Sequence, residues 1–255
     1  MTGPARLRSV GAMTRNAPIR VAAAITAGLV AAGSVAGCGL STNRFSDEHT
    51  EAVALTAITT DGGSGSVTVS SGPAGSVRVL RHVTYRGTKP GATDQRSGTT
   101  LALKTTCGSQ CSVSYEVTAP AGVRVSGHSG SGALNLSDVS TVGVDVGSGA
   151  VTVRQASGDV NVQTGSGAVR LTGISGPAVV NTGSGAVTVQ VTGPGNVTVR
   201  TGSGAIRVTV PSGVRYRVNA LSDSGHVDVK VPTDPAAEHA IDVHSGSGAV
   251  IVEAG

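Results

Sequence analysis

Branched aliphatic residues alternate with polar residues along almost the whole chain after residue 50. The segment Val187-Thr-Val-Gln-Val191 is typical, and Gly, Ser, Pro and Asn separate such segments from one another. A period of two places successive side chains on opposite faces of a β-strand. No segment after residue 50 combines an apolar helical period with capping residues. The pattern therefore predicts an all-β protein built from many short strands.

One motif, Gly-Ser-Gly-Ala followed by an aliphatic residue, recurs in the second half of the chain. Its copies begin at Gly130, Gly147, Gly165, Gly183, Gly202 and Gly246. The first five starts are 17, 18, 18 and 19 residues apart, and a weaker half-repeat such as Ser157-Gly-Asp-Val-Asn-Val162 lies between copies. Fixed self-similarity of this kind is typical of solenoids. We expect a parallel β-solenoid whose rungs of about 18 residues hold two strands and two turns. A flexible Gly/Ser-rich stalk is the alternative interpretation.

Aligning the repeats assigns each position of a rung to a face. The aliphatic positions of both strands are expected to point inward, because their alternate neighbours are polar. After the glycine corner these inward positions are Val151, Val153, Val169, Leu171, Val187, Val189, Ile206 and Val208. In the other strand they are Val142, Val144, Val160, Val162, Ala178, Val180, Val197 and Val199. The expected architecture is two sheets packed back to back around a thin core.

The two ends of the domain depart from the repeat. Residues 51–125 hold short strands after glycine turns, longer strands and a predicted loop at 87–98, so we expect antiparallel hairpins that cap the N-terminal end. Residues 126–255 form the solenoid itself. Turns at 209–213 and 232–235 interrupt its period, and the last Gly-Ser-Gly-Ala-Val copy is expected to close the C-terminal end.

Residues 1–37 have the pattern of a secretory signal. Residues 1–20 are basic without any acidic residue, and residues 21–36 are apolar, uncharged and end in small side chains. As a helix, this stretch would span about 24 Å, less than the roughly 30 Å hydrocarbon core of a bilayer, which disfavours a permanent transmembrane helix.

The apolar stretch ends in Val35-Ala36-Gly37-Cys38, which resembles a bacterial lipobox. Cys38 is therefore the expected lipidation site and the N-terminus of the mature protein. A plain signal peptide with a chance cysteine is the alternative. Residues 38–50 are polar, and we predict that they form a tether between the membrane and the domain.

Composition and charge argue against two classes of protein, those with aromatic sugar subsites and those that bind nucleic acid. The chain has three Tyr, one Phe and no Trp, too few to line the aromatic sugar subsites of a lectin or polysaccharide hydrolase. Its formal charge of +4 comes from four arginines that precede the apolar stretch, Arg6, Arg8, Arg15 and Arg20. The remaining 15 basic residues balance the 15 acidic ones, so no nucleic-acid partner is expected.

Candidate catalytic and metal-binding groups do not assemble along the sequence. In Asp61-Gly-Gly-Ser-Gly-Ser-Val67, valine stands where a calcium-binding glycine-rich repeat has aspartate. Asp138, Asp145 and Asp159 are 7 and 14 residues apart, which does not place them in one column for a metal-dependent lyase. Asp223-Ser-Gly-His226 holds the residue types of a catalytic triad, but strand neighbours point to opposite faces. We expect no catalytic residue, metal or cofactor.

The cysteines beyond Cys38 form an even pair. Cys107 and Cys111 flank Gly-Ser-Gln in a domain that the N-terminal signal predicts to be exported. A zinc site would need two further ligands, and none lies nearby. We therefore predict a disulfide that closes this small loop in an oxidising compartment.

Three segments resemble a known family. Val117-Thr-Ala-Pro-Ala-Gly-Val-Arg-Val125 precedes Ser129-Gly-Ser-Gly-Ala-Leu-Asn-Leu136, and Val208-Thr-Val-Pro-Ser-Gly-Val-Arg-Tyr216 echoes the first. A Pro-x-Gly before serial Ser-Gly-Asp-Val or Ser-Gly-Ala-Val rungs is similar to the bacterial "putative adhesin" domain family, over about residues 52–254. The resemblance implies an exported β-strand-repeat protein of the cell envelope whose molecular activity is not defined. Ala replaces the common Asp in most rungs, and only Asp159 keeps the acid, which lowers the expectation of cation binding.

The outward positions form two polar columns. Asp145, Gln163, Asn181 and Arg200 share one register, and Thr152, Arg170, Thr188 and Arg207 share the other. Amides stacked in register can form a hydrogen-bonded ladder. The candidate binding face comprises Gln163, Asn181, Arg200, Arg170 and Arg207, and would suit an envelope glycan or an envelope protein. The alternative is an ordinary soluble surface.

These features predict a lipid-anchored protein on the extracytoplasmic face of the cell membrane. It would act as a non-catalytic binding or structural module, with the membrane and a cell-wall glycan or envelope protein as partners. One alternative is an accessory protein of an envelope-stress or regulatory system that contacts a membrane partner. Another is a glycan-active β-helix enzyme.

Overall fold

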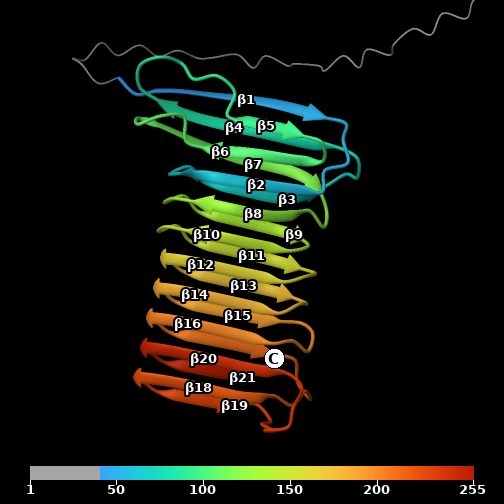
Figure 1. The fold of residues 1–255 in the computed structure, drawn as a ribbon, viewed down its shortest axis with the longest axis vertical. Helices are drawn as coiled ribbons and strands as arrows, with labels where there is room; N and C mark the ends of the chain where they lie inside the picture. The colour runs from blue at the N-terminus through green and yellow to red at the C-terminus, as the bar shows by residue number, and fades with distance from the viewer. Residues whose placement is uncertain (1–40) are drawn as a thin grey trace, which may run out of the picture.

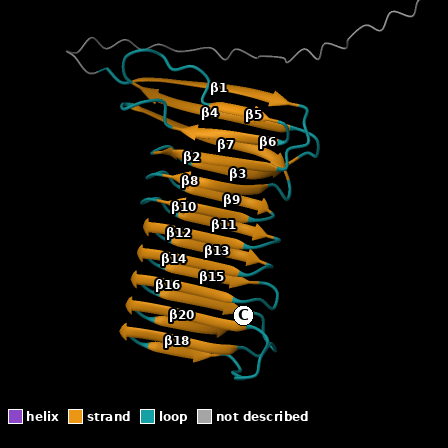
Figure 2. Ribbon diagram, viewed as in Figure 1, coloured by secondary structure: helices purple, strands orange, loops and turns teal. Residues whose placement is uncertain are grey.

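The computed structural model describes residues 41–255, which form a tall stack of β-strands without any helix (Figures 1 and 2). The all-β class predicted from the sequence is confirmed. The predicted signal peptide, residues 1–37, and the predicted lipidation site Cys38 lie outside the described residues.

Two long sheets run the length of the stack. Sheet A has eleven strands in the order β1 (Asn43–Glu51), β4 (Val77–Tyr85), β7 (Cys111–Pro120), β3 (Val67–Gly72), β9 (Leu134–Val139), β11 (Val151–Ala156), β13 (Val169–Ile174), β15 (Val187–Val191), β17 (Ile206–Val210), β21 (Val250–Ala254) and β19 (Val227–Lys230). Sheet B has ten, in the order β5 (Asp94–Ser97), β6 (Thr100–Thr105), β2 (Ala57–Gly63), β8 (Arg124–Ser129), β10 (Val142–Val146), β12 (Val160–Ser166), β14 (Ala178–Ser184), β16 (Val197–Ser203), β20 (Ala240–Ser247) and β18 (Arg217–Ser224).

The repeated segments stack as parallel rungs, one strand in each sheet. Each repeat pairs with the next in the register that the sequence predicts: Val160 lies beside Ala178, and Ala178 beside Val197. In sheet A, Val169 lies beside Val187, and Val187 beside Ile206. The parallel β-solenoid with two strands per rung is therefore confirmed.

Burial alternates along every strand of the repeat, as the face assignment requires. All sixteen inward positions predicted from the alignment are buried, and Val162, Val180 and Val199 are fully inaccessible. The polar neighbours lie on the outer faces. Burying a valine contributes roughly 1.5 kcal/mol or more. A core of valines is narrow, so its stability accumulates over many stacked rungs.

The glycine corners allow successive rungs to approach each other. Gly185 has φ 141°, a conformation that residues with a side chain rarely adopt. A Cβ at this position would also collide with the backbone carbonyl oxygen of Gly167 in the preceding rung. The second glycine of each Gly-Ser-Gly-Ala motif therefore serves the stacking of the corners.

The C-terminal end of the stack corrects one prediction. The last Gly-Ser-Gly-Ala-Val copy does not close the solenoid, because β20 and β21 pair between the β16–β17 rung and an outermost rung made of β18 and β19. Gly246 consequently stacks on Gly202, although 44 residues separate them. The chain passes one rung outward and then returns to fill the gap. The true end is the irregular rung, where Leu221 and Val229 are exposed.

The N-terminal cap, predicted as antiparallel hairpins over residues 51–125, is antiparallel only in part. Antiparallel pairing joins β1, β4 and β7 in sheet A and β5 with β6 in sheet B. In contrast, β2 and β3 form an ordinary parallel rung between β6–β7 on one side and β8–β9 on the other. The predicted loop 87–98 contains the strand β5.

Residues 43–50, which we predicted to belong to a tether, form the edge strand β1 together with Glu51 instead. This strand pairs with β4 over nine positions. Its sequence looks like a linker because the positions on the core side carry Asp47, His49 and Glu51. These side chains form ion pairs with Arg81, Asp94 and Arg96, respectively, and close the end of the core with charge. Inward-pointing charges also protect an edge strand from pairing with another chain.

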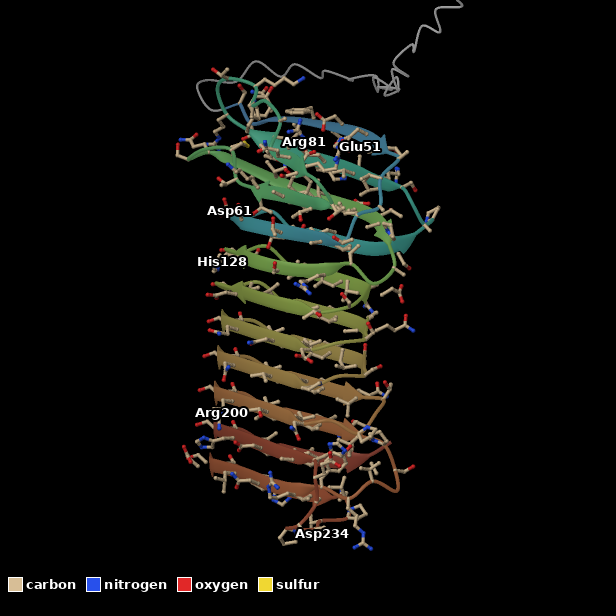
Figure 3. The ribbon with its side chains drawn as sticks, turned by 45° about the vertical axis from the view of Figure 1, so that its right-hand side comes forward. Glu51, Asp61, Arg81, His128, Arg200 and Asp234 are labelled. Atoms are coloured by element: carbon tan, nitrogen blue, oxygen red, sulfur yellow. A yellow bond between two sulfur atoms is a disulfide. The ribbon has the colours of Figure 1, made fainter. Side chains whose placement is uncertain are left out.

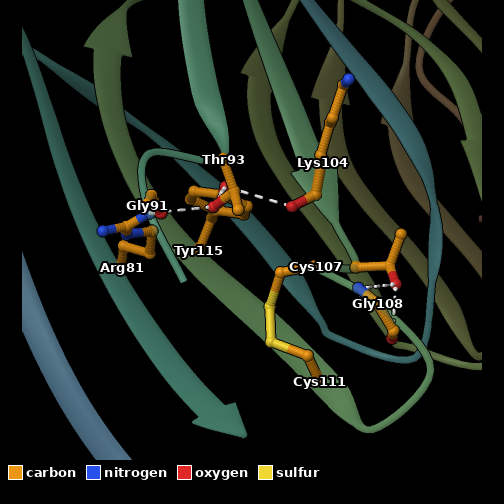
Figure 4. Close-up of a disulfide and its surroundings, with 9 residues drawn as sticks. Arg81, Gly91, Thr93, Lys104, Cys107, Gly108, Cys111 and Tyr115 are labelled. Carbon is orange, nitrogen blue, oxygen red and sulfur yellow. Dashed lines mark hydrogen bonds between the residues drawn. A yellow bond between two sulfur atoms is a disulfide. The ribbon is translucent and has the colours of Figure 1, made fainter. Parts of the chain in front are cut away.

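Arg81 is the centre of this charged end, and its side chain is buried between the two sheets (Figure 4). It binds both carboxylate oxygens of Asp47, at 2.8 and 2.5 Å, and donates to the carbonyl oxygen of Gly91 and the hydroxyl of Thr93. Thr93 in turn lies 2.6 Å from the hydroxyl of Tyr115. Burial raises the pKa of Tyr115 to about 12, although the hydrogen bond with Thr93 opposes this rise. The network joins β1, β4, β7 and the segment before β5.

Substitutions at two neighbouring positions test the register of the core. Val180→Asp places an unpaired charge in the core, and we expect it to lower the free energy of unfolding by at least about 3 kcal/mol. Asn181→Asp lies on the outer face, and we expect a change below about 1 kcal/mol. Urea unfolding of both variants provides the measurement. Similar losses for the two variants would contradict the face assignment.

The ion pair at the cap predicts a dependence of stability on pH. Hydrogen bonds from Arg81 lower the pKa of Asp47 below its ordinary value of 3.8. Ionised Asp47 therefore stabilises the fold above that value, and this contribution disappears as the pH falls through the lower pKa of the folded state. Asp47→Asn should lower the melting temperature at pH 7, and its difference from the wild type should shrink below about pH 4.

The control for this prediction is Glu48→Gln, which breaks the exposed pair with Arg78. Solvent screens this pair, so its effect on the melting temperature should be much smaller. An Asp47→Asn effect that is equally large at pH 2.5 would show that charge pairing is not its cause.

Candidate functional site

The outer face of sheet B carries a shallow groove of about 610 Å³. One polar side chain from each of five consecutive strands lines its length: Asp145, Gln163, Asn181, Arg200 and His244. Asp223 from the outermost rung stands at the end. Glycine corners of the repeats form one side of the groove, so its surface combines a polar column with bare backbone. Figure 3 shows Arg200 on this column and His128 above it.

Charged groups occupy the two ends of the groove. At the C-terminal end, Arg200 lies 2.8 Å from Asp242, and His244 Nε2 lies 3.1 Å from Asp223 Oδ1. At the other end, His128 Nδ1 lies 3.8 Å from Asp145. The side chains of all three pairs are exposed to solvent, so these contacts orient the groups and contribute little stability.

Two amides occupy the middle of the groove. Gln163 and Asn181 lie side by side in register, as predicted. Within residues 41–255, however, no side-chain hydrogen bond joins them, so the predicted amide ladder has the right register but lacks its bonds. Their donors and acceptors thus remain available to a ligand.

The five residues of the predicted binding face do not form one surface. Gln163, Asn181 and Arg200 line the groove of sheet B, whereas Arg170 and Arg207 lie on the outer face of sheet A. The two outer faces point away from each other because the sheets pack back to back. Arg207 is also engaged with Glu253, at 2.7 Å. The predicted strand and parity of each residue agree with the structure, but the two columns lie on opposite outer faces.

The acidic residues considered for catalysis lie apart in the structure. Asp138 is on β9 of sheet A and accepts a hydrogen bond from Ser71, whereas Asp145 is on β10 of sheet B. Within residues 41–255, Asp223 forms no hydrogen bond or ion pair with His226 and pairs instead with His244 of the neighbouring strand. Among residues 41–255, no three His, Cys, Asp or Glu side chains gather where they could hold a metal ion. The same residues include no helix long and apolar enough to cross a bilayer.

Cys107 and Cys111 form the predicted disulfide, with their Cα atoms 5.2 Å apart (Figure 4). The bond closes the connection between β6 and β7, close to the N-terminal end of the stack. It faces a second hollow of about 430 Å³ that Tyr85 and Arg86 also line.

Sequence reasoning missed the contribution of Asp242, His244 and Asp223 to the groove. Strand β20, which holds Asp242 and His244, follows β16 by 44 residues in the sequence but pairs directly with it in sheet B. A signal was present, because Ile241-Asp-Val-His244 has the same parity as Val197-Thr-Val-Arg200.

Comparison with known proteins places the chain in a family. A family profile described as Toastrack DUF4097 matches residues 51–253. Among solved structures, the chain is similar to a "putative cell adhesion protein" from Clostridium sporogenes, with 12% identity, a TM-score of 0.36, and coverage of 83% of this chain and 100% of that one. It is also similar to a "putative adhesin" from Bacteroides fragilis, with 15% identity, a TM-score of 0.34, and coverage of 86% and 98%. No curated protein matches it. Because the profile spans most of its length, the chain belongs to the Toastrack DUF4097 family.

Proposed function

We propose that this protein is a lipid-anchored, non-catalytic binding module of the cell envelope, and that the groove of sheet B holds a strand of envelope glycan. The observation that carries this proposal is the in-register polar column of the groove. Gln163, Asn181 and Arg200 present amide and guanidinium groups at successive rungs, about 4.8 Å apart. A polymer of hydroxyl-rich units can bond to such a column at several points.

The chemistry of the groove favours a glycan over an apolar peptide. No large hydrophobic side chain lines it, and its walls are amide, carboxylate, guanidinium, imidazole and backbone groups. Without aromatic platforms, each sugar unit makes only modest contacts. The affinity therefore comes from contacts summed over several rungs, and it grows with the length of the polymer.

The anchoring part of the proposal is supported by Val35-Ala36-Gly37-Cys38 at the end of the apolar stretch. The disulfide between Cys107 and Cys111 supports export, because such bonds persist in oxidising compartments. Two acyl chains provide stable attachment, which a single chain does not.

A second candidate partner is an envelope protein at the far end of the stack. Leu221, with 52% of its surface exposed, and Val229, with 37%, are the exposed large hydrophobic residues within residues 41–255, and both lie on the outermost rung. Such residues at an open strand edge suit a protein contact. An accessory role towards a membrane protein would use this end and leave the groove free.

Paired substitutions on the two sheets test the groove. Asn181→Ala combined with Arg200→Ser should weaken binding to purified cell-wall glycan by about tenfold or more, since each lost hydrogen bond is worth roughly 1 kcal/mol. The matched control is Thr188→Ala with Arg170→Ser, which removes an equivalent pair from neighbouring rungs of sheet A and should leave binding unchanged. Cosedimentation with the insoluble glycan measures both.

Two outcomes would contradict the groove proposal. One is equal binding of the two double variants. The other is the release of soluble fragments or new reducing ends from the glycan by the wild-type protein, which would identify an enzyme. Loss of binding to an envelope protein in Leu221→Ser alone, with binding to the glycan unchanged, would favour the protein partner.

Anchoring is tested on the mature protein. Mass spectrometry should find an N-terminal diacylated Cys38, and Cys38→Ser should leave the chain unprocessed or release it from the membrane fraction. The physical reason is that the thiol of Cys38 carries the lipid. A soluble wild-type product that begins at another residue would refute the lipoprotein assignment.

A further inference from the structure

The carboxylates of strands β1 and β5, at the N-terminal end of the stack, each contact a basic side chain. Four pairs account for them: Asp47 with Arg81, Glu48 with Arg78, Glu51 with Arg96, and Asp94 with His49. The carboxylates of β1 and β5 are thereby engaged within the cap.

Three basic residues close to the start of β1 remain outside these pairs. Arg44, Arg86 and Lys89 are exposed, and no carboxylate of residues 41–255 lies within ion-pair distance of any of them. Arg44 lies at the start of β1, and Arg86 and Lys89 lie in the segment that follows β4. These three residues form a basic corner, whereas Lys104 and Arg124, which are also exposed and outside the ion pairs of residues 41–255, lie on β6 and β8 of sheet B.

In the corner made of Arg44, Arg86 and Lys89, the last two contact residues at the start of the described chain, and Arg44 lies opposite Thr84, two residues before Arg86, in the β1–β4 pair. Arg86 Nε donates to the hydroxyl of Thr42 at 3.2 Å. Lys89 Nζ lies 4.4 Å from the centre of the Phe45 ring, a cation–π contact. Figure 1 shows that the segment between β4 and β5 rises beside the beginning of β1, at the end of the stack where the chain enters.

The short distance along the chain between Cys38 and β1 places the corner close to the membrane surface once Cys38 is lipidated. Cys38 precedes Ser41, the first described residue, by three residues, and three residues span at most about 11 Å. Because residues 43–51 are a strand and not a tether, the acyl chains would hold the corner within a short distance of the lipid headgroups. Basic side chains near a surface of anionic lipid are attracted to it over about one Debye length.

We propose that the corner of Arg44, Arg86 and Lys89 is a docking surface for anionic phospholipid headgroups, which holds the solenoid end-on at the membrane. The proposal rests on the proposed acylation of Cys38 and adds a partner and an orientation to it. The ten strands of sheet B, about 4.8 Å apart, then extend roughly 43 Å away from the surface. The groove runs along this axis, and the exposed rung of Leu221 and Val229 is at the distant end.

The experiment uses the full acylated protein, reconstituted into vesicles of phosphatidylcholine with or without phosphatidylglycerol. A fluorescent amino acid is placed at Thr88, beside the corner, or at Val229, at the far end. Nitroxide-labelled headgroups quench a fluorophore that touches the membrane surface. We expect strong quenching at position 88 in vesicles with phosphatidylglycerol, little at position 229, and loss of the difference in about 1 M salt, where the Debye length is about 3 Å.

The test variant is Arg44→Ser with Arg86→Ser and Lys89→Ser. Each charge near an anionic surface contributes about fivefold, so the ratio of docked to undocked protein should fall on the order of 100-fold. The matched control is Arg124→Ser with Arg154→Ser and Arg170→Ser, three exposed arginines on β8, β11 and β13 that form no ion pair within residues 41–255. This control removes the same charge and should leave quenching unchanged. Arg44→Lys with Arg86→Lys and Lys89→Arg retains the charge and should also dock.

The outcomes separate the two proposals. Equal quenching of the test and control variants, or equal quenching with and without phosphatidylglycerol, would overturn the docking surface. Acylation is read independently from the mass of the same preparation, so its absence would refute the anchor alone. Should the corner prefer wall polymer, soluble teichoic acid would abolish quenching at position 88 at low salt, which also overturns the lipid assignment.

Discussion

Each rung of this solenoid bonds to its neighbours through both of its strands, and it can do so only if the corner between the strands has room for the corner of the next rung. The Gly-Ser-Gly-Ala corners meet this requirement, since a Cβ at Gly185 would collide with the carbonyl oxygen of Gly167. The register of the rungs and the packing of the core depend on that close approach. The rungs stay in register, valine stacks on valine, and the core can be thin because each layer is covered by the next.

The same register determines how the outer faces vary along the stack. Because equivalent positions lie directly beside one another, the outward residues of successive repeats form straight columns. Each rung contributes one residue to a column, and those residues set the polarity and charge of the column. On sheet B the column changes from Asp145 through two amides to Arg200 and His244, so the groove has neutral amides in its middle and acid–base pairs at its two ends. Sheet A carries its own column on the opposite side.

A stacked solenoid must also end, and the two ends differ. At the N-terminal end, β1 and β5 cover the core with ion pairs around the buried Arg81, which leaves a charged surface with no exposed large apolar side chain among the described residues. At the C-terminal end, the β18–β19 rung leaves Leu221 and Val229 exposed. At both ends the order of the strands in space differs from their order in the sequence. Strands β4–β7 follow the β2–β3 rung in the sequence but lie outside it, and the β18–β19 rung precedes the β20–β21 rung but lies outside it. The protein thus has a polar end next to its predicted anchor and a more apolar end at a distance.

The sequence alone determined the strand class, the rung period, the face of each repeat residue and the Cys107–Cys111 bond, because these depend on alternation and on neighbours a few residues apart. It did not determine which rungs are adjacent at the ends, since parity assigns a residue to a face and says nothing about its partner strand. Asp47 looked like part of a linker because the arginine that pairs with it lies 34 residues away. Only the folded chain brings those charges together, and a strand whose core-side positions carry ion-pairing side chains has no apolar pattern by which the sequence could reveal it.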